Sequence, residues 1–451
     1  MAKYKAYPEY KDSGVEWLGK VPNHWEILSA KRMFQSVRTP AYKSDEQLAA
    51  SQKYGVIPQS LMMQLNDSKV MLALKGTESF RHVEANNFVI SLRSFEGGIE
   101  YSQYTGCVSP AYTVLKNSKP ISYGYYRYLL KCTPFIAALQ SSTDSLRDGK
   151  SINYEQFSAL SLPLSSVQEQ NVIAAFLDHE TAKIDNLIEK QQQLIELLKE
   201  KRQAVISHAV TKGLNPDVPM KDSGVEWLGE VPEHWVGSSL KYMAKVIDCK
   251  HITAEFSDVG IPVASISEVK SWFVDLSTAK LTNEKDYLLL IDGGRKPVCG
   301  DIIYSRNATV GEAAIVSDNM PDFAMGQDVC LIKTNQKVIP EFILYTLKSD
   351  IIAQQLNLAM IGSTFKRINV DDIRNFSIAI PPKNEQVLIV KTLMGKLEKY
   401  DRIISNAVDV ITYMQERRTA LISAAVTGKI DVRDWVAPDT QNVEEPQEAT
   451  A

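Results

Sequence analysis

The sequence has few of the features that mark secreted, membrane or zinc-binding proteins. Its five cysteines are scattered and include no Cys-x-x-Cys pair, which argues for reduced thiols in the cytoplasm and against a zinc site. No uninterrupted apolar run approaches the roughly 18 residues that a membrane span requires, and the N-terminus lacks the apolar stretch of a secretory signal. The sequence therefore predicts a cytoplasmic protein with no membrane partner.

Catalytic motifs are scarce as well. There is no glycine-rich phosphate loop ending in Lys-Ser or Lys-Thr, and no Asn/Asp-Pro-Pro-Phe/Tyr tetrad of the kind that holds a flipped base in amino-methyltransferases. Glu268-Val269-Lys270, with Asp258 upstream, has a nuclease-like form, but patterns this short arise by chance. We therefore expect no catalytic residue, no metal site and no cofactor in this chain.

The overall charge does not indicate a nucleic-acid partner, because the net charge of the chain is -4. Residues 1–162 carry 19 basic and 14 acidic side chains, a net of +5, whereas residues 214–380 carry 16 and 22, a net of -6. Any basic surface that contacts DNA must therefore be local.

The chain contains two long-range repeats. Residues 11–19, Lys-Asp-Ser-Gly-Val-Glu-Trp-Leu-Gly, return as residues 221–229, and the match continues through a Val-Pro and a His-Trp pair. A second repeat, at an offset of 216, relates residues 204–211 to residues 420–427. Offsets this long predict duplicated domains, since solenoid repeats have periods of roughly 20–50 residues.

Two long helices are predicted. Residues 168–210 carry mostly apolar side chains at heptad positions a and d, with polar interruptions but no glycine or proline, and Ile188 and Ile195 widen the stripe at position e. The heptad pattern recurs 216 residues later. Gly213 and Gly428 follow the two helices, where a left-handed cap is expected. The predicted pairing residues are Leu177, Ile184, Leu187, Leu194, Leu198, Leu393, Tyr400, Ile403, Val410 and Met414. A homodimeric coiled coil or plain core packing is the alternative, but two such helices in one chain favour an intrachain antiparallel pair.

The remaining sequence predicts an α+β fold. Short β-rich runs occur at residues 87–92, 111–115, 301–305 and 329–332, and short helices are expected at 123–132 and 340–349. We expect two globular domains with small curved antiparallel sheets, separated by two long antiparallel coiled-coil-like helices and related by an internal pseudo-two-fold. The predicted boundaries are residues 1–162 for the first domain, 163–213 for the first helix, 214–380 for the second domain, 381–430 for the second helix, and 431–451 for a largely disordered tail.

Four boundary motifs complete this pattern. They are the Gly-Val-Glu-Trp-Leu-Gly segment from Gly14, Leu162-Pro163-Leu164 with Glu169-Gln170, Ile380-Pro381-Pro382 with Glu385-Gln386, and the basic pairs Lys201-Arg202 and Arg417-Arg418 before Ala-Val-Thr endings. With them, nearly the whole chain resembles the specificity subunit of type I restriction–modification systems. The resemblance implies two target-recognition domains that each recognise one half of a bipartite, asymmetric DNA site. It also implies paired helices that set the spacing and dock modification subunits.

The same resemblance implies partner subunits and assigns catalysis to them. The partners would be double-stranded DNA, two modification (methyltransferase) subunits and two restriction (motor-nuclease) subunits. The chain itself would be non-catalytic, within a complex that carries adenine-specific methyltransferase and ATP-dependent endonuclease activity. S-adenosylmethionine, ATP and Mg would be bound by the partner subunits.

Arg93 and Arg306 are aligned residues that each follow a predicted strand, at an offset of 213. A guanidinium in this position suits a bidentate contact with guanine or with a phosphate. A structural salt bridge or a solvated arginine is an equally strong alternative.

A second aligned loop precedes a short helix in each domain. Asn153 and Asn369 are expected at helix N-caps, with Gln156 and Asp372 three residues later as in a capping box. The basic residues just before these caps could bind a phosphate, although the caps alone explain the loop. The full set of predicted DNA-binding residues is Arg81, Arg93, Tyr112, Arg147, Lys150, Arg295, Lys296, Arg306, Asn307, Gln327, Lys366 and Arg367.

The two domains differ within this set, so two different half-sites are expected. Two alternatives remain open from the sequence. One is a non-catalytic fragment of a fused restriction–methyltransferase, and the other is a coiled-coil scaffold protein without DNA specificity.

Overall fold

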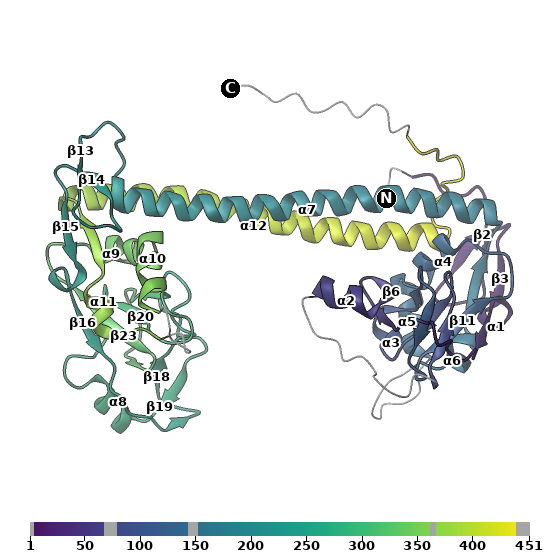
Figure 1. Cartoon of the computed structure of the whole chain (residues 1–451), viewed down its shortest axis with the longest axis horizontal. Coiled ribbons are helices and arrows are strands. Elements are labelled where there is room, and N and C mark those ends of the chain that lie inside the picture. The colour runs from purple at the N-terminus through teal and green to yellow at the C-terminus, as the bar shows by residue number, and fades with distance from the viewer. Residues whose placement is uncertain (1–3, 67–78, 143–151, 361–366, 439–451) are drawn as a thin grey trace. The chain divides into compact units, whose positions relative to one another are not determined.

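The computed structural model describes residues 4–66, 79–142, 152–360 and 367–438, and the chain forms two compact units (Figure 1). Unit 1 comprises residues 1–191 and 409–451, and unit 2 comprises residues 192–408. Each unit therefore contains one globular domain and one part of each long helix. Among the described residues, no helix is both long enough and apolar enough to cross a bilayer.

The globular part of unit 1 consists of short strands and helices. Its strands are β1 (Tyr10–Asp12), β2 (Lys20–Pro22), β3 (Glu26–Ser29), β4 (Phe34–Val37), β5 (Leu48–Ser51), β6 (Gly55–Pro58), β7 (Arg81–Val83), β8 (Phe88–Ile90), β9 (Glu100–Tyr101), β10 (Gly106–Val108), β11 (Thr113–Asn117) and β12 (Ser161–Leu164). Its helices are α1 (Ala30–Met33), α2 (Gln59–Asn66), α3 (Ser94–Gly97), α4 (Tyr123–Leu129), α5 (Thr133–Ser141) and α6 (Tyr154–Ala159).

The globular part of unit 2 has a similar order of elements. Its strands are β13 (Met220–Asp222), β14 (Glu230–Pro232), β15 (Val236–Ser239), β16 (Ala244–Asp248), β17 (Phe256–Ser257), β18 (Ile261–Ala264), β19 (Lys280–Thr282), β20 (Ile302–Ser305), β21 (Ala313–Ile315), β22 (Ala324–Met325), β23 (Val329–Thr334) and β24 (Ser377–Ile380). Its helices are a 3-10 turn (Leu240–Tyr242), α8 (Glu284–Ile291), α9 (Pro340–Leu347), α10 (Asp350–Ala359) and α11 (Val370–Arg374).

The sheets show that the two domains are duplicates. The central antiparallel sheet has the order β4-β11-β8-β9 in unit 1 and β16-β23-β20-β21 in unit 2. The repeated opening sequence forms the hairpin β1–β2 in one unit and β13–β14 in the other, with Tyr10 opposite Pro22 and Met220 opposite Pro232. Unit 2 adds a sheet of order β17-β19-β18-β22, in which β18 and β22 are parallel. The predicted α+β fold, with its strands and short helices, is confirmed.

The core of each domain lies between its central sheet and a short helix. In unit 1, Phe34 lies 5.6 Å from Phe88 and 5.5 Å from Tyr126 of α4, measured between ring centroids. All three residues of β8 and all four of β20 are buried, as expected of continuous apolar runs covered on both faces. Covering both faces of such a strand excludes water from its ladder.

The two long helices are α7 (Val167–Lys212) and α12 (Lys383–Val426), close to their predicted bounds. Gly213 and Gly428 follow them with φ of 79° and 71°, so the predicted left-handed caps are confirmed. A Cβ on Gly428 would lie 2.4 Å from Cδ of Pro22, so this position also requires close approach to the opening hairpin.

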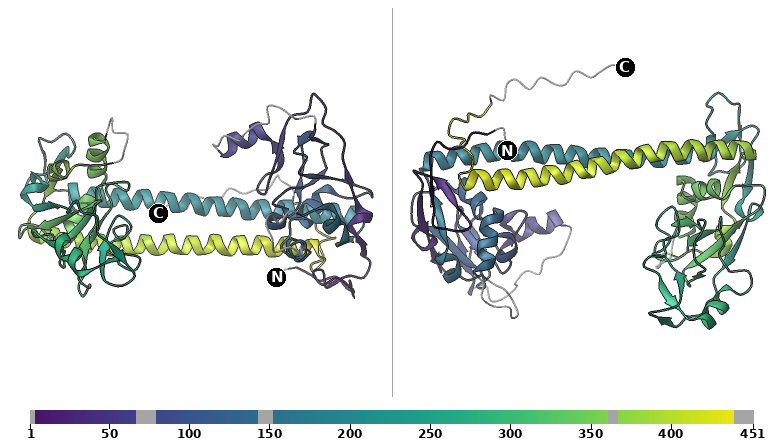
Figure 2. Two further views of the ribbon diagram at one scale, coloured as in Figure 1. Left: turned by 90° about the horizontal axis from the view of Figure 1, so that it is seen from below. Right: turned by 180° about the vertical axis from the view of Figure 1, so that it is seen from behind.

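The helices run antiparallel within each unit, as Figures 1 and 2 show. In unit 1, Asp185 of α7 lies 2.8 Å from Arg418 of α12. In unit 2, Asp401 of α12 lies 3.1 Å from Arg202 of α7. Each residue of one ion pair is 216 positions from its counterpart in the other, which is the offset of the sequence repeat. These half-exposed pairs are worth less than about 1 kcal/mol each, so they indicate register more than stability.

The buried stripe of the helices differs from the predicted seam. Positions a and e are buried at Leu177, Ile184 and Ile195 of α7 and at Leu393 and Leu397 of α12, whereas position d is buried near the helix ends, at Ile173, Ile389 and Ala424. Leu198, Tyr400 and Met414, at position a, are partly buried. The predicted d-position residues Leu187, Leu194, Ile403 and Val410 are exposed, so their assignment to the helix seam is corrected. An a/e stripe alternates by four and three residues, so it is as narrow as an a/d stripe but rotated about the helix axis. Near the domains, where position d is buried as well, the apolar face is wider, as expected of a helix that also packs on a globular domain.

The expected disorder from residue 431 onward does not hold for the first residues of the tail. Val432 is buried, and the Trp435 ring lies 5.8 Å from the Phe176 ring of α7. The backbone NH of Asp431 donates to the Lys5 carbonyl at 2.8 Å. The two chain ends therefore meet in unit 1, and the rest of the predicted tail, residues 439–451, lies outside the described residues.

Replacing Leu393 by alanine should lower the free energy of unfolding of unit 2 by about 2–5 kcal/mol, because the side chain is fully buried in its core. The matched change Ile403→Ala, at a residue that is 43% exposed on the same helix, should cost less than about 1 kcal/mol. Urea denaturation of both variants measures the difference. Equal losses would contradict the a/e register.

Candidate nucleic-acid interface

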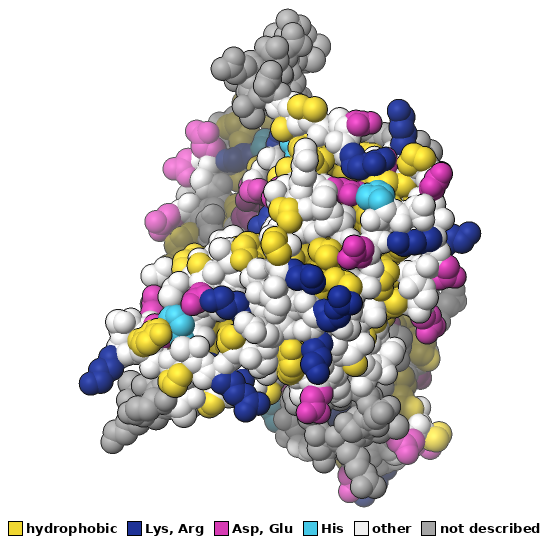
Figure 3. All heavy atoms as spheres, turned by 90° about the vertical axis from the view of Figure 1, so that its right-hand side faces the viewer, with side chains coloured by type: hydrophobic (Ala, Val, Ile, Leu, Met, Phe, Trp, Pro, Cys, Tyr) yellow, Lys and Arg dark blue, Asp and Glu magenta, His cyan; other side chains and the backbone are white. Residues whose placement is uncertain are grey.

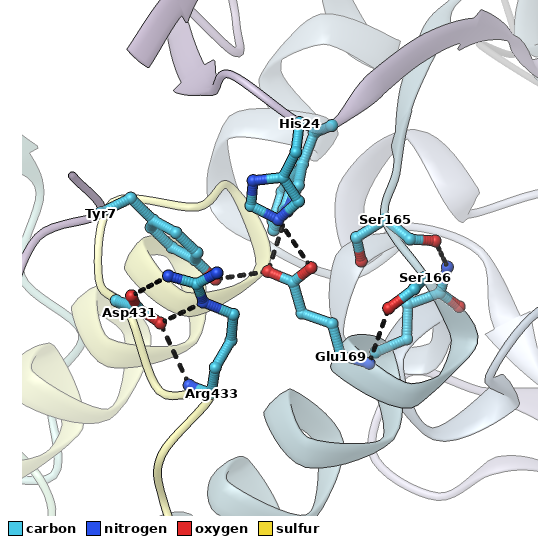
Figure 4. Close-up of polar contacts among 9 residues, drawn as sticks. Tyr7, His24, Ser165, Ser166, Glu169, Asp431 and Arg433 are labelled. Atoms are coloured by element: carbon cyan, nitrogen blue, oxygen red, sulfur yellow. Dashed lines mark hydrogen bonds and ion pairs between the residues drawn. The ribbon is translucent and has the colours of Figure 1, made fainter. Parts of the chain in front are cut away.

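A buried glutamate in the first turn of α7 joins the opening segment of unit 1 to that helix (Figure 4). Oε1 of Glu169 accepts hydrogen bonds from Tyr7 Oη at 2.8 Å and from the Trp25 indole NH at 3.0 Å, and Oε2 lies 2.9 Å from His24 Nε2. Burial and the nearby Glu169 carboxylate raise the pKa of Tyr7 above the ordinary value of a phenol. The Arg433 guanidinium lies 5.0 Å over the Tyr7 ring.

The same arrangement recurs in unit 2. Oε2 of Glu385, in the first turn of α12, lies 2.8 Å from His234 Nε2 and accepts from the Trp235 indole NH at 3.1 Å. The neighbouring Gln386 accepts from the backbone NH of Ile339, just before α9, at 2.9 Å. The sequence Glu-Gln at the start of each helix therefore positions the globular domain on that helix.

In unit 1, the predicted DNA-binding residues lie at one end of the central sheet. The register pairs Ile90 of β8 with Thr113 of β11, so Arg93 and Tyr112 are at the same end of these strands. Arg81 donates to the Tyr112 carbonyl at 2.6 Å, which connects this end of the sheet to β7. Arg93 is exposed at the start of α3, whereas Arg81 and Tyr112 are partly buried.

In unit 2, the predicted residues lie at the equivalent end of the equivalent sheet. Ser305 of β20 pairs with Val329 of β23, so Arg306 and Asn307 adjoin Gln327. Asn307 also forms an isolated bridge with Arg367, which brings the second predicted loop to the same place. Gln327 and Arg367 are exposed. Two loops that are far apart in sequence thus converge on one surface.

Arg306 is not exposed at this surface. Its side chain is 4% exposed and lies 2.6 Å from Asp248 Oδ1, with a further contact of 3.6 Å to Cys249 Sγ. The structure therefore shows the alternative for Arg306, a structural salt bridge. The prediction that its guanidinium contacts a base is corrected, because the guanidinium is buried. Its backbone carbonyl accepts from Ile368 NH at 3.0 Å, so Arg306 positions the Arg367 loop.

The remaining basic candidates of unit 2 have local partners. Arg295 donates to the carbonyls of Asp248 and Asp292, each at 2.8 Å. Lys296 is exposed and lies 2.8 Å from Asp322. These contacts leave Lys296 the more accessible of the two, although its charge is already paired.

The predicted caps have different outcomes in the two units. Asn153 and Gln156 form the reciprocal hydrogen bonds of a capping box, at 2.9 and 3.0 Å, as predicted. Asn369 does occupy the N-cap of α11, but its side chain makes no cap hydrogen bond, so the second capping box was wrong. Arg147, Lys150 and Lys366 lie outside the described residues.

Asp248, Cys249 and His251 form the one group of three metal-type ligands found in the described part of the chain, with ligand atoms within 4.8 Å of one another. Arg306 lies against both Asp248 and Cys249, so a guanidinium already neutralises this site. Burial raises the pKa of the Cys249 thiol, which disfavours the thiolate that binds metals. Asp248 was missed from the sequence, because its pairing opposite Cys330 depends on the register of β16 with β23.

Charges of both signs are distributed over the face of unit 1 that Figure 3 shows. Lys and Arg side chains occur next to Asp and Glu side chains across the view. This agrees with the modest net charge of residues 1–162 and with contact surfaces that are local.

Comparison with known proteins fits the duplicated domains. The family model "Type I restriction modification DNA specificity domain" matches residues 22–197 and again residues 232–407. The chain belongs to this family. It is a specificity subunit of a type I restriction–modification system, with two tandem recognition domains.

Relatives of this specificity subunit match it along almost its whole length. The Type I restriction enzyme MjaVIII specificity subunit of Methanocaldococcus jannaschii is 23% identical, covering 92% of this chain and 95% of the relative. The EcoKI specificity subunit of Escherichia coli is 21% identical, covering 96% and 95%.

Two solved structures share the fold of this specificity subunit. A chain from a study of complex assembly and conformational transition of the type I R-M system has a TM-score of 0.68 at 12% identity, covering 91% of this chain and 99% of its own length. The HsdS subunit from Thermoanaerobacter tengcongensis has a TM-score of 0.52 at 13% identity, covering 91% and 98%.

Glu169→Gln should lower the stability of unit 1 by about 2–3 kcal/mol, because one buried carboxylate serves three hydrogen-bonding partners. Glu385→Gln should cost about 1 kcal/mol, since its carboxylate is more exposed and serves two. Native-state hydrogen exchange in each unit measures these losses, with the exposed Glu200→Gln of α7 as the control. A larger loss for Glu385→Gln would contradict the proposed role of burial.

Arg306→Ala should destabilise unit 2 by about 1–3 kcal/mol, because it leaves the partly buried Asp248 carboxylate without its cation. Arg93→Ala, at an exposed side chain, should change the stability of unit 1 by less than about 0.5 kcal/mol. Thermal denaturation of the two variants tests this difference between aligned residues. A stable Arg306→Ala variant would refute the structural role of that ion pair.

Proposed function

We propose that this specificity subunit recognises a bipartite, asymmetric site in double-stranded DNA, with one half-site for each domain. The observation that carries the proposal is the convergence of predicted contact residues at equivalent ends of the two central sheets. Exposed Arg93 in unit 1, and exposed Gln327 and Arg367 in unit 2, are the side chains best placed to reach DNA. Arginine suits guanine or phosphate, and glutamine suits adenine.

The two surfaces would recognise different sequences. In unit 1 the sheet end carries an arginine and a tyrosine, Arg93 and Tyr112, and in unit 2 it carries Asn307, Gln327 and Arg367. Hydrogen-bonding groups that differ in this way favour different base edges, so the half-sites would not form a palindrome. Contacts to phosphate would fix the position of each domain without adding sequence preference.

The long helices would set the spacing between half-sites and dock modification subunits. Support comes from the exposed apolar side chains that α7 and α12 present away from their buried stripe, among them Leu197, Met394 and Tyr413. Such side chains would supply apolar contacts to a docked subunit. The proposed partners are two modification subunits and two restriction subunits.

Catalysis would belong to the partners. The modification subunits would bind S-adenosylmethionine and methylate adenine, and the restriction subunits would use ATP and Mg. In this chain, the Glu268 carboxylate of the nuclease-like motif is buried and accepts from Ser265 NH and Oγ at 2.7 and 2.6 Å. Those contacts close a local turn, which supports a structural role for Glu268.

Methylome sequencing of host cells with and without the gene for this chain tests the proposed function. A bipartite, adenine-methylated motif should be present in the first and absent in the second. A methylome unchanged by removal of the chain would overturn the proposal. Methyl transfer by the isolated chain would overturn its assignment as non-catalytic.

Arg93→Ala should relax recognition of one half-site only, by about 1–3 kcal/mol of discrimination, because a bidentate base contact is lost. Competition binding with DNA variants in each half-site, carried out with the assembled methyltransferase, measures this. Arg402→Ala, an exposed arginine of α12, is the matched control and should leave both half-sites unchanged. Intact selectivity in the Arg93→Ala complex would show that the contact residues lie elsewhere.

A further inference from the structure

Unit 2 contains an open groove between the end of α7, the start of α12 and the segment that follows Gly213. Its volume is about 510 Å³. Val205, Ala209 and Leu393 supply apolar lining, and three basic or titratable side chains also line it: Lys201, His208 and Lys396. We refer to it as the unit 2 groove.

The equivalent position in unit 1 is filled by aromatic side chains from the two chain ends. Phe176 is the counterpart of Thr392 at the offset of 216, and its ring lies 5.4 Å from Tyr4 and 5.8 Å from Trp435. Trp435 also lies 5.6 Å from the His179 ring, whose counterpart is Gly395. Unit 2 thus has smaller side chains where unit 1 has an aromatic cluster.

Charge also differs between the two positions. In unit 1, Tyr4 Oη donates to Glu180 at 3.1 Å and is also near Arg417, so one acid and one base flank the aromatic ring. Their counterparts in unit 2 are Lys396 and Lys201, which both line the groove. His208 replaces Ala424. Compared with the equivalent position in unit 1, the unit 2 groove also has apolar side chains but carries more positive charge.

From these observations, we propose that the unit 2 groove binds a short segment of a partner protein that carries an aromatic anchor next to acidic residues. The groove has an apolar lining and lacks the aromatic side chains that fill the equivalent position in unit 1. It therefore suits an aromatic side chain of the partner. The positive charges of Lys201 and Lys396 favour carboxylates next to that aromatic side chain. This interaction surface does not depend on DNA recognition, so it stands or falls separately from the proposed function.

The chain itself supplies a probe. Residues 431–438 pack on unit 1 and contain Trp435 preceded by Asp431 and Asp434, so a peptide of this sequence with the Arg433→Glu change has the required chemistry. The fluorescein-labelled peptide should bind the full-length chain with a Kd on the order of 100 µM, as expected for one aromatic anchor with charge support. In the intact chain, residues 431–438 already cover the unit 1 position, so the unit 2 groove is the expected target of the added peptide.

Fluorescence anisotropy with groove variants locates the binding. Thr392→Phe restores the residue found in unit 1, where Phe176 packs against Trp435, and should strengthen binding about threefold or more by giving the peptide tryptophan the same contact. Lys396→Glu should weaken binding at least tenfold, and a peptide with lysines in place of its acids should regain affinity for that variant. Lys399→Glu makes the same charge change at an exposed residue of α12 that does not line the groove, and should leave binding unchanged.

Three results would overturn the proposal. The first is no binding up to about 1 mM peptide, or binding that Thr392→Phe and Lys396→Glu do not affect. The second is self-association of the chain that Lys396→Glu abolishes, which would assign the groove to a second copy. The third is peptide binding that appears only after deletion of residues 439–451, which would assign it to the chain's own tail. Thermal denaturation of each variant verifies that it is folded.

Discussion

A long helix with one apolar face is stable in water only when another element covers that face, and this constraint organises the whole chain. Each of the two long helices supplies the cover for the other, and the globular domains pack beside them. Asp185–Arg418 and its repeat Asp401–Arg202 show that the antiparallel register is the same in both units. Because the two halves of the sequence are duplicates, the two helices pack against each other in the same way in both units.

The start of each helix is also where its domain is attached. Glu169 and Glu385 accept the indole NH of a tryptophan that the opening repeat supplies, so a single buried carboxylate orients the segment entering each domain. The central sheets then place loops from distant parts of the sequence at one end. In the proposed function, recognition would change through these loops while the helix and its attachment stay the same.

The sequence predicted the large features because they rest on repetition and periodicity. The bounds of α7, the glycine caps and strands such as β8 were correct to within a few residues. It failed where tertiary contacts decide. Heptad positions d were assigned to the seam along the whole of each helix, but they are buried only near the ends, as at Ile173 and Ile389, and the d residues between are exposed. Arg93 and Arg306 look equivalent in sequence, yet only Arg306 meets an aspartate, because strand register brings Asp248 beside it.

The central claim is that two separate domains of one chain each determine half of the recognised DNA. Exchanging residues 1–162 for the corresponding domain of another type I specificity subunit, followed by sequencing of the host methylome, tests it most directly. The hybrid should direct methylation to a motif in which one half is new and the other half and the spacer length are unchanged. A motif altered in both halves, or one continuous sequence without a spacer, would contradict independent recognition by the two domains.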